Sequence, residues 1–113
     1  MEKVSRYREV IKRLMQEKAR FYTGGPDDGV ESVMLMDEER GHYGLMQFGW
    51  ENGKRVKFIT LYVRLKDGKF WIEQDLTEEG IATELLREGV PKEDIVLAFH
   101  APEMRPYTEF AAA

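Results

Sequence analysis

Residues 42–76 read HYGLMQFGWENGKRVKFITLYVRLKDGKFWIEQDL and contain two strong hairpin signals. Asn52-Gly53 and Asp67-Gly68 both suit type I′ turns, which need positive φ at two successive residues. The segments beside these turns are rich in β-branched and aromatic residues, as strands are. The stretch therefore predicts three antiparallel strands, at about His42 to Trp50, Arg55 to Lys66 and Lys69 to Leu76.

The residues before this stretch predict one more strand and a helix. A looser turn at residues 38–41 connects the stretch to a strand at about Val30 to Asp37, which completes a four-stranded antiparallel meander. Residues 2 to 22 carry an apolar stripe at alternating three- and four-residue spacing, which is typical of an amphipathic helix. The stripe consists of Val4, Tyr7, Ile11, Leu14 and Phe21, widened by Val10, Met15 and Tyr22. The run from Gly24 to Gly29 is expected to end this helix.

Counting outwards from the two turns predicts the register and the two faces of the sheet. Met46 should face Ile59, Val63 should face Ile72, and Leu65 should face Phe70. One predicted face is apolar and should lie under the helices: Met46, Phe48, Ile59, Leu61, Val63, Leu65, Phe70, Ile72 and Leu76. The other predicted face mixes aromatic and polar residues: Tyr43, Leu45, Gln47, Phe58, Thr60, Tyr62, Arg64, Trp71, Glu73 and Asp75.

That mixed composition is common at half-exposed interfaces. Either a partner or the C-terminal part of the same chain could cover the mixed face. If a partner covers it, Tyr62 and Trp71 should keep accessible area in a single protomer. Burial of both side chains by their own chain would remove the interface hypothesis.

The C-terminal third predicts a second helix and a short strand. Thr77 is the expected N-cap of a helix that runs to about Glu88 and ends at Gly89. Pro91 begins a short turn through Asp94, and the apolar run Ile95 to Phe99 is a possible fifth strand. The tail contains Pro102 and Pro106, so we expect it to lie extended over the body. The expected fold is α+β, with residues 1–113 as one domain.

Composition excludes several classes of protein. The chain has 113 residues and no cysteine, so it fits one domain without disulfides or thiolate metal sites. No apolar run approaches the roughly 20 residues of a membrane span, and no signal-peptide pattern is visible, so we expect a cytoplasmic protein without membrane contact. The formal charge of −4 disfavours tight binding to duplex nucleic acid.

The sequence gives little support to a catalytic function. His42 and His100, with acids nearby such as Asp37 and Glu103, could in principle hold a divalent metal, but their spacing is not diagnostic. In the predicted register His42 shares the apolar face with Val63, where a histidine is usually structural.

A nuclease signature is suggested by Pro26-Asp27 with Asp67-Gly68-Lys69. However, nuclease acids sit on adjacent strands beside the phosphate, whereas Asp67-Gly68 is expected at a hairpin tip. We predict no catalytic residue, metal or cofactor.

The first helix offers a possible DNA-binding surface and a possible dimer contact. Its outer positions gather seven cations, Lys3, Arg6, Arg8, Lys12, Arg13, Lys18 and Arg20, against Glu2, Glu9 and Glu17. An ordinary solvated helix face has the same appearance, and the acidic remainder of the chain favours that interpretation. Its stripe also approximates three heptads, which are marginal for a free coiled coil. A homodimer through the mixed sheet face is the other possibility.

The chain resembles the XisI family along nearly its whole length. The matching residues include Trp71-Ile72, Gly80-Ile81-Ala82, the run from Gly89 to Leu97, Phe99-His100 and the run from Tyr107 to Ala111. Earlier matches are Tyr7, Asp37, Arg40, His42-Tyr43 and Gly49-Trp50. So long an ordered series is more specific than any short motif. The resemblance departs at Tyr62 and Arg64, where the family pattern often has a histidine and an aspartate, so the partner or the contact could differ.

What the resemblance implies is a cyanobacterial accessory factor, the fdxN element excision controlling factor. It acts in programmed site-specific DNA excision, a form of DNA recombination, together with a recombinase, XisF, and a nuclease-like companion, XisH. We therefore expect a non-enzymatic regulatory factor that contacts an XisH-like protein and a recombinase, with metal-dependent nuclease or direct DNA binding as alternatives. The expected partner-binding residues are Tyr43, Tyr62, Arg64, Trp71, His100, Arg105 and Tyr107.

Overall fold

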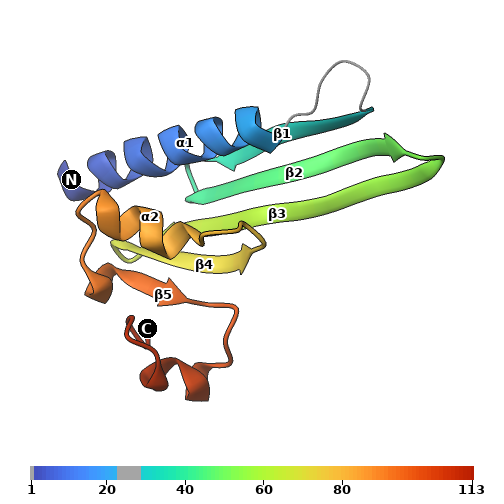
Figure 1. The fold of residues 1–113 in the computed structure, drawn as a ribbon. Coiled ribbons are helices and arrows are strands. Elements are labelled where there is room, and N and C mark those ends of the chain that lie inside the picture. Colours follow the sequence, from blue (N-terminus) through green and yellow to red (C-terminus); the bar gives the residue numbers. More distant parts are fainter. Residues whose placement is uncertain (1, 23–28) are drawn as a thin grey trace.

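A long helix, a five-stranded sheet, a short helix and a looped tail follow one another along the chain (Figure 1). The computed structural model describes residues 2–22 and 29–113, so the expected glycine-rich helix end at residues 24–28 lies outside the described residues. The elements are α1 (Glu2–Tyr22), β1 (Val30–Asp37), β2 (His42–Glu51), β3 (Lys54–Lys66), β4 (Lys69–Asp75), α2 (Ile81–Arg87), η1 (Lys92–Asp94), β5 (Ile95–Leu97) and η2 (Pro102–Tyr107), where η denotes a 3₁₀ helix. The predicted α+β fold with its antiparallel meander is confirmed.

The strands follow the order β1-β2-β3-β4-β5, and only β5 runs parallel to its neighbour. Both predicted hairpin turns are confirmed, because Asn52 and Gly53 have φ of 51° and 76° and Asp67 and Gly68 have φ of 56° and 73°. The possible fifth strand also forms. It is parallel to β4 because α2 carries the chain back across the sheet before β5 begins.

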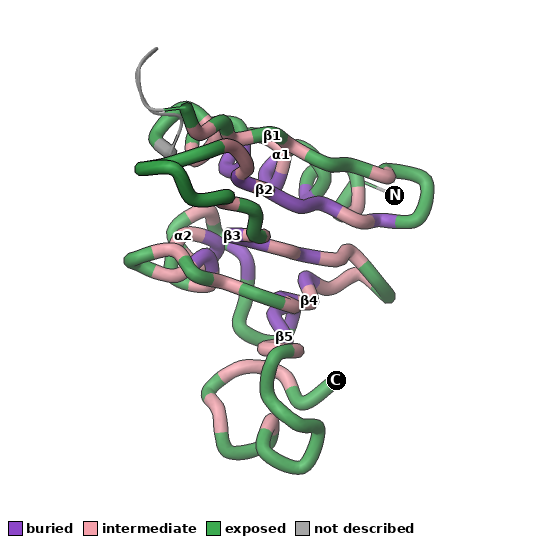
Figure 2. Tube along the Cα trace, turned by 90° about the vertical axis from the view of Figure 1, so that its right-hand side faces the viewer, coloured by how far each residue is buried: buried purple, intermediate pink, exposed green. Residues whose placement is uncertain are grey.

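The hydrophobic core lies between one face of the sheet and the two helices. Buried positions run through the centre of the sheet in Figure 2, chiefly along β2, β3 and β4. From α1, Tyr7, Ile11 and Leu14 enter this core, and the Tyr7 ring lies 4.7 Å from that of Phe70. α2 contributes Ile81 and Leu85. The predicted stripe of α1 is therefore largely confirmed, although Phe21 at its end is 77% exposed.

A β-bulge at Thr60 reverses the predicted faces of β2 and of the part of β3 that precedes the bulge. The predicted pair Met46–Ile59 is present, but the next residue of β2, Leu45, pairs with Leu61 and leaves Thr60 unpaired. One extra residue on β3 switches the alternation of side chains from that point on. Tyr43, Leu45, Gln47 and Thr60 are consequently buried on the helix side, and the expectation that they lie on the mixed face is wrong.

The same bulge moves residues out of the expected core. Met46, Phe48 and Ile59 are only half-buried and lie on the face without helices. His42 pairs with Arg64 and not with Val63, so its predicted place on the apolar face is also wrong. Leu76, another expected core residue, is 60% exposed beyond the end of β4. A second bulge, at Glu73, leaves the predicted pairs Val63–Ile72 and Leu65–Phe70 intact.

The start of α2 and the tail differ from the predictions. Thr77 does not cap α2, which begins only at Ile81. The N–H of Ile81, the first residue of α2, instead donates to Asp75 Oδ2 at 2.7 Å. The tail is not extended, because residues 102–107 form η2, in which 3₁₀ geometry accommodates both prolines. No helix in the described residues is both long and apolar enough to cross a membrane.

Candidate functional site

The candidate site is the sheet face opposite the helices, which we call the open face. Cross-strand partners point to the same side of an antiparallel sheet, so the pairing defines its members. They are Glu31, Val33, Leu35 and Asp37 from β1, His42, Gly44, Met46, Phe48 and Trp50 from β2, Arg55, Lys57, Ile59, Tyr62 and Arg64 from β3, and Trp71, Glu73 and Gln74 from β4. Several large apolar side chains on this face remain accessible, including Leu35 at 49% and Trp50 at 58%.

A hollow of about 400 Å³ opens on this face between β1, β2 and β3. Its lining combines an apolar part, made by Leu35, Met46 and Ile59, with a polar part that includes Tyr62 and His42. Tyr62 Oη and His42 Nδ1 share a hydrogen bond of 2.7 Å, and the two rings are perpendicular. This arrangement suits an apolar or aromatic group that carries one polar end.

Asp37 and Arg40 also line the hollow. Arg40 Nη1 donates to Asp37 Oδ2 at 2.9 Å, and the backbone N–H of Arg40 donates to Oδ1 at 3.2 Å. The hydrogen bonds from Arg40 hold the pKa of Asp37 below its ordinary value. The carboxylate therefore stays charged at neutral pH and supplies a fixed acceptor beside the apolar floor.

A second group of residues surrounds Trp71 at the other end of the open face. The indole Nε1–H of Trp71 donates to Lys66 O at 3.0 Å, and Lys66 Nζ lies 5.4 Å from the ring centroid. The Arg105 guanidinium lies 5.8 Å from the same centroid, which is within cation–π range. Arg64 forms an ion pair of 3.6 Å with Glu73 beside this ring.

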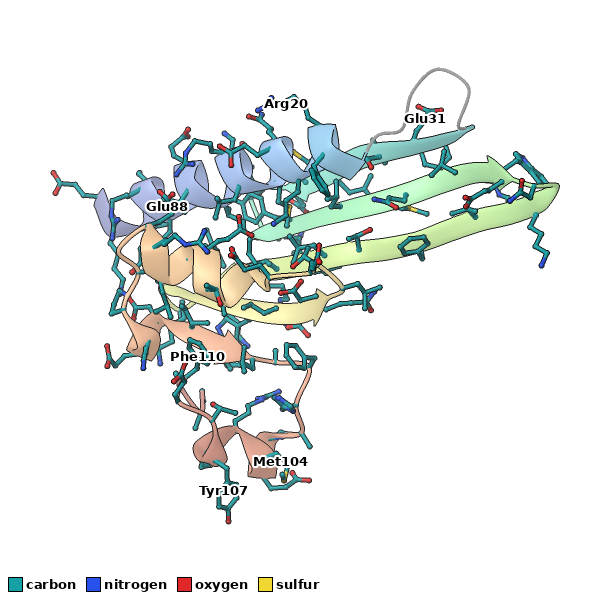
Figure 3. All side chains as sticks on the ribbon, in the orientation of Figure 1. Arg20, Glu31, Glu88, Met104, Tyr107 and Phe110 are labelled. Carbon is teal, nitrogen blue, oxygen red and sulfur yellow. The ribbon has the colours of Figure 1, made fainter. Side chains whose placement is uncertain are left out.

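Arg105 also holds the tail in place. Its Nε–H donates to His100 O at 3.0 Å, and its Nη2–H donates to Ala98 O at 3.1 Å. The same tail presents His100, exposed against the Phe99 ring, and Tyr107, which is 84% exposed. Figure 3 shows Tyr107 and Met104 on η2, where both side chains point away from the sheet.

The structure brings together most of the predicted site residues. Tyr62, Arg64 and Trp71 share the open face, and the expectation that Tyr62 and Trp71 keep accessible area is confirmed. Tyr43 is fully buried and lies outside this surface. The hollow itself was missed, because the bulge that turns Met46 and Ile59 outward has no clear signature in the sequence.

The described residues give little support to the hypotheses of a metal site and of a nuclease site. No group of three or more His, Asp or Glu side chains has the geometry of a metal site in residues 2–22 and 29–113. Asp67-Gly68 occupies a hairpin tip as expected, whereas Pro26-Asp27 lies outside the described residues.

Four of the seven cations of α1 form ion pairs with acids from other parts of the chain. Lys3 pairs with Asp94, Lys12 with Glu38, Arg13 with Glu88 and Lys18 with Glu84. Such pairing reduces the positive field that a phosphate backbone would meet. The ion pairs therefore weaken the hypothesis that this helix binds DNA.

A comparison with protein-family models matches residues 1–112 to the family described as XisI protein. This chain belongs to the XisI family. A crystal structure of a XisI-like protein from Anabaena variabilis ATCC 29413 superposes with a TM-score of 0.88 at 38% identity, covering 97% of this chain and 99% of that one. The fdxN element excision controlling factor XisI from the same organism gives a TM-score of 0.83 at 38% identity, covering 98% and 99%. The comparison with curated proteins gives no significant match.

The XisI-family resemblance expected from the residues is thus confirmed, and so is its fold. The XisI fold accounts for the division of this molecule into two surfaces. Its helices cover one face of the sheet, and side chains such as Leu35 and Trp50 stay accessible on the other face.

Proposed function

We propose that this XisI-family chain is a non-enzymatic regulatory factor in programmed DNA excision and that it acts by binding a partner protein through its open face. The name of the similar Anabaena variabilis protein, an fdxN element excision controlling factor, supports the process. The observation that carries the mode of action is the hollow on the open face, because an accessible apolar depression with a fixed polar lining is typical of a site that receives an anchor side chain.

The proposed partner is an XisH-like, nuclease-related protein, with a recombinase as a further member of the assembly. An anchor side chain of the partner fills the hollow beside Leu35, Met46 and Ile59, and its polar end meets Tyr62 or His42. Arg64 and Trp71 extend the contact along the sheet, and His100, Arg105 and Tyr107 extend it onto the tail. Tyr43 takes no part, because contact with it would require opening the core.

Co-expression with the product of a neighbouring XisH-like gene tests this proposal. The wild-type chain should co-purify with that protein, and Met46→Glu should weaken the complex at least about tenfold because it places a carboxylate in a desolvated apolar contact. Phe58→Glu is the matched control. It adds the same charge on the adjacent strand, but Phe58 pairs with Gln47 and so points to the opposite side of the sheet.

Two results would contradict the proposal. Equal loss of the complex in both variants would show that the hollow is not the contact. Metal-dependent cleavage of DNA by the purified wild-type chain alone would replace the regulatory role with the nuclease alternative. Salt-dependent duplex binding that is lost in an Arg6, Arg13 and Arg20 neutralisation variant would support direct DNA binding through α1.

A further inference from the structure

The two edges of the sheet differ in how they are protected from pairing with another chain. At one edge, β5 has only three residues, and the tail closes it: Ala111 N–H donates to Ile95 O at 2.8 Å, and Ala111 bridges to Val96. Short edge strands and covering segments are the usual devices against edge-to-edge association. The C-terminal residues therefore block the β5 edge.

β1 forms the other edge and, in the described residues, lacks the short length and the covering tail that protect β5. It is eight residues long, it contains no proline or lysine, and no strand of the described residues pairs with its outer side. Its pairing with β2 shows no register shift, whereas both inner hairpins contain a bulge. Val33, Leu35 and Met36 are 37%, 49% and 46% exposed. Figure 1 shows β1 at the margin of the sheet. A long, regular edge strand with exposed apolar side chains is a template for another strand.

The hydrogen-bond pattern identifies the backbone groups that β1 offers at this edge. Just before β1, Trp50 N–H donates to Gly29 O at 2.9 Å. In an antiparallel ladder, hydrogen-bonded pairs alternate with non-bonded pairs. Because Gly29 and Trp50 form a bonded pair, every second residue after Gly29 is also bonded to β2, which includes the pairs Val33–Met46 and Leu35–Gly44. The N–H and C=O groups of the even-numbered residues, from Val30 to Met36, consequently point away from β2.

We propose that a second copy of this chain pairs antiparallel with β1, about a two-fold axis beside Val33. An antiparallel pair of identical edges has its axis perpendicular to the sheet, so both open faces lie on the same side and the contact closes as a dimer. In this register Val30 bonds with Met36 of the other copy, and Ser32 bonds with Met34. The two Val33 side chains then meet in a non-bonded pair, where side chains approach most closely.

The charges on β1 select this register. Its only charged residues are Glu31 and Asp37. In the register centred on Met34 each Glu31 would face Asp37 of the other copy, and like charges directly opposite are destabilising. Centring on Val33 places Leu35 opposite Glu31 and Gly29 opposite Asp37, while all four outward-pointing residues remain paired. This inference does not depend on the proposed partner contact.

A single-cysteine experiment tests the register directly, because these 113 residues contain no cysteine. In the proposed dimer the Cα atoms of a Val33 pair lie about 4.5 Å apart, within the disulfide range. Val33→Cys should therefore form a covalent dimer under mild oxidation. The matched control is Leu35→Cys, on the same face of the same strand. Its two copies would lie about 14 Å apart and should stay reduced.

Sedimentation tests the dimer without cross-linking. The wild-type chain should sediment as a dimer at micromolar concentration, and Val33→Lys should weaken the dimer at least about tenfold because it opposes two ammonium groups. Phe58→Lys should remain dimeric. If Val33→Lys does not fold, the cysteine pair decides. A monomeric wild type, a dimer that survives Val33→Lys, or a cross-link through Leu35→Cys in place of Val33→Cys would overturn the inference.

Discussion

At the scale of single residues, one buried carboxylate connects the first helix to the C-terminal third. Asp94 is only 9% exposed. Its Oδ2 accepts a hydrogen bond of 2.6 Å from Tyr7 Oη and forms an ion pair of 2.9 Å with Lys3 Nζ. Burial alone would raise the pKa of Asp94, but Tyr7 and Lys3 outweigh it and lower the pKa. Burial, with the neighbouring Asp94, raises the pKa of Tyr7 to about 12.

This network predicts a specific loss of stability in acid. Because the pKa of folded Asp94 lies below its unfolded value, its stabilisation is present above pH 4 or so and disappears as the pH falls through the folded pKa. Tyr7→Phe removes one of the two groups that lower this pKa. We expect the variant to lose about 1–3 kcal/mol at pH 7 and to show a smaller further loss between pH 5 and about 2 than the wild type does.

Urea unfolding of both proteins across this pH range measures the difference. Tyr107→Phe is a suitable control because Tyr107 is 84% exposed and lies on the tail. Equal acid sensitivity of the wild type and Tyr7→Phe would show that Asp94 does not carry this part of the stability.

At the scale of elements, Asp75 fixes the connection between the sheet and α2. Its Oδ2 accepts the N–H of Ile81 at 2.7 Å, and its Oδ1 accepts the N–H of Thr77 at 2.9 Å. The Thr77 hydroxyl hydrogen-bonds the same carboxylate. One side chain thus caps α2 from six residues away, and Thr77 supports the loop between them.

Substitution at these two positions should separate the cap from the loop support. Asp75→Ala should cost about 0.5–2 kcal/mol, the usual value of a lost helix cap, and should reduce helical circular dichroism. Thr77→Ala should cost less, because Asp75 would still accept the N–H groups of Ile81 and Thr77. Chemical denaturation measures both effects, and a larger loss in Thr77→Ala would restore threonine as the cap.

At the scale of the whole molecule, the last residues protect one sheet edge and so limit how the protein associates. Phe110 packs against the core, and Ala111 bonds to β5. The structure therefore has one closed edge at β5, one open edge at β1, and one uncovered face between them.

Removal of residues 108–113 should have two consequences. The free energy of unfolding should fall by about 1–3 kcal/mol through loss of the Phe110 packing. The β5 edge should also become available, so the truncated chain should form species larger than the dimer proposed through β1. Thermal unfolding and light scattering measure these effects. Unchanged stability and size would show that the tail neither packs nor protects.

The sequence alone determined the local structure of this protein. The dipeptides Asn52-Gly53 and Asp67-Gly68 fix two turns through their φ angles, and the apolar periodicity of residues 2–22 fixes α1; both signals act over a few neighbouring residues. The ordered matches of the C-terminal third were also sufficient for the XisI family. The turn and helix predictions hold because the signals that carry them lie within a few neighbouring residues.

Only the tertiary structure decided which face of the sheet is open. Thr60 is the extra residue at a register shift between β2 and β3. The position of such a bulge depends on how strands that are far apart in the chain pair, and no local sequence pattern marks it here. That single extra residue buries Tyr43, exposes Met46 and Ile59, and brings His42 to Tyr62. The hollow therefore exists because of long-range packing, which local sequence patterns do not encode.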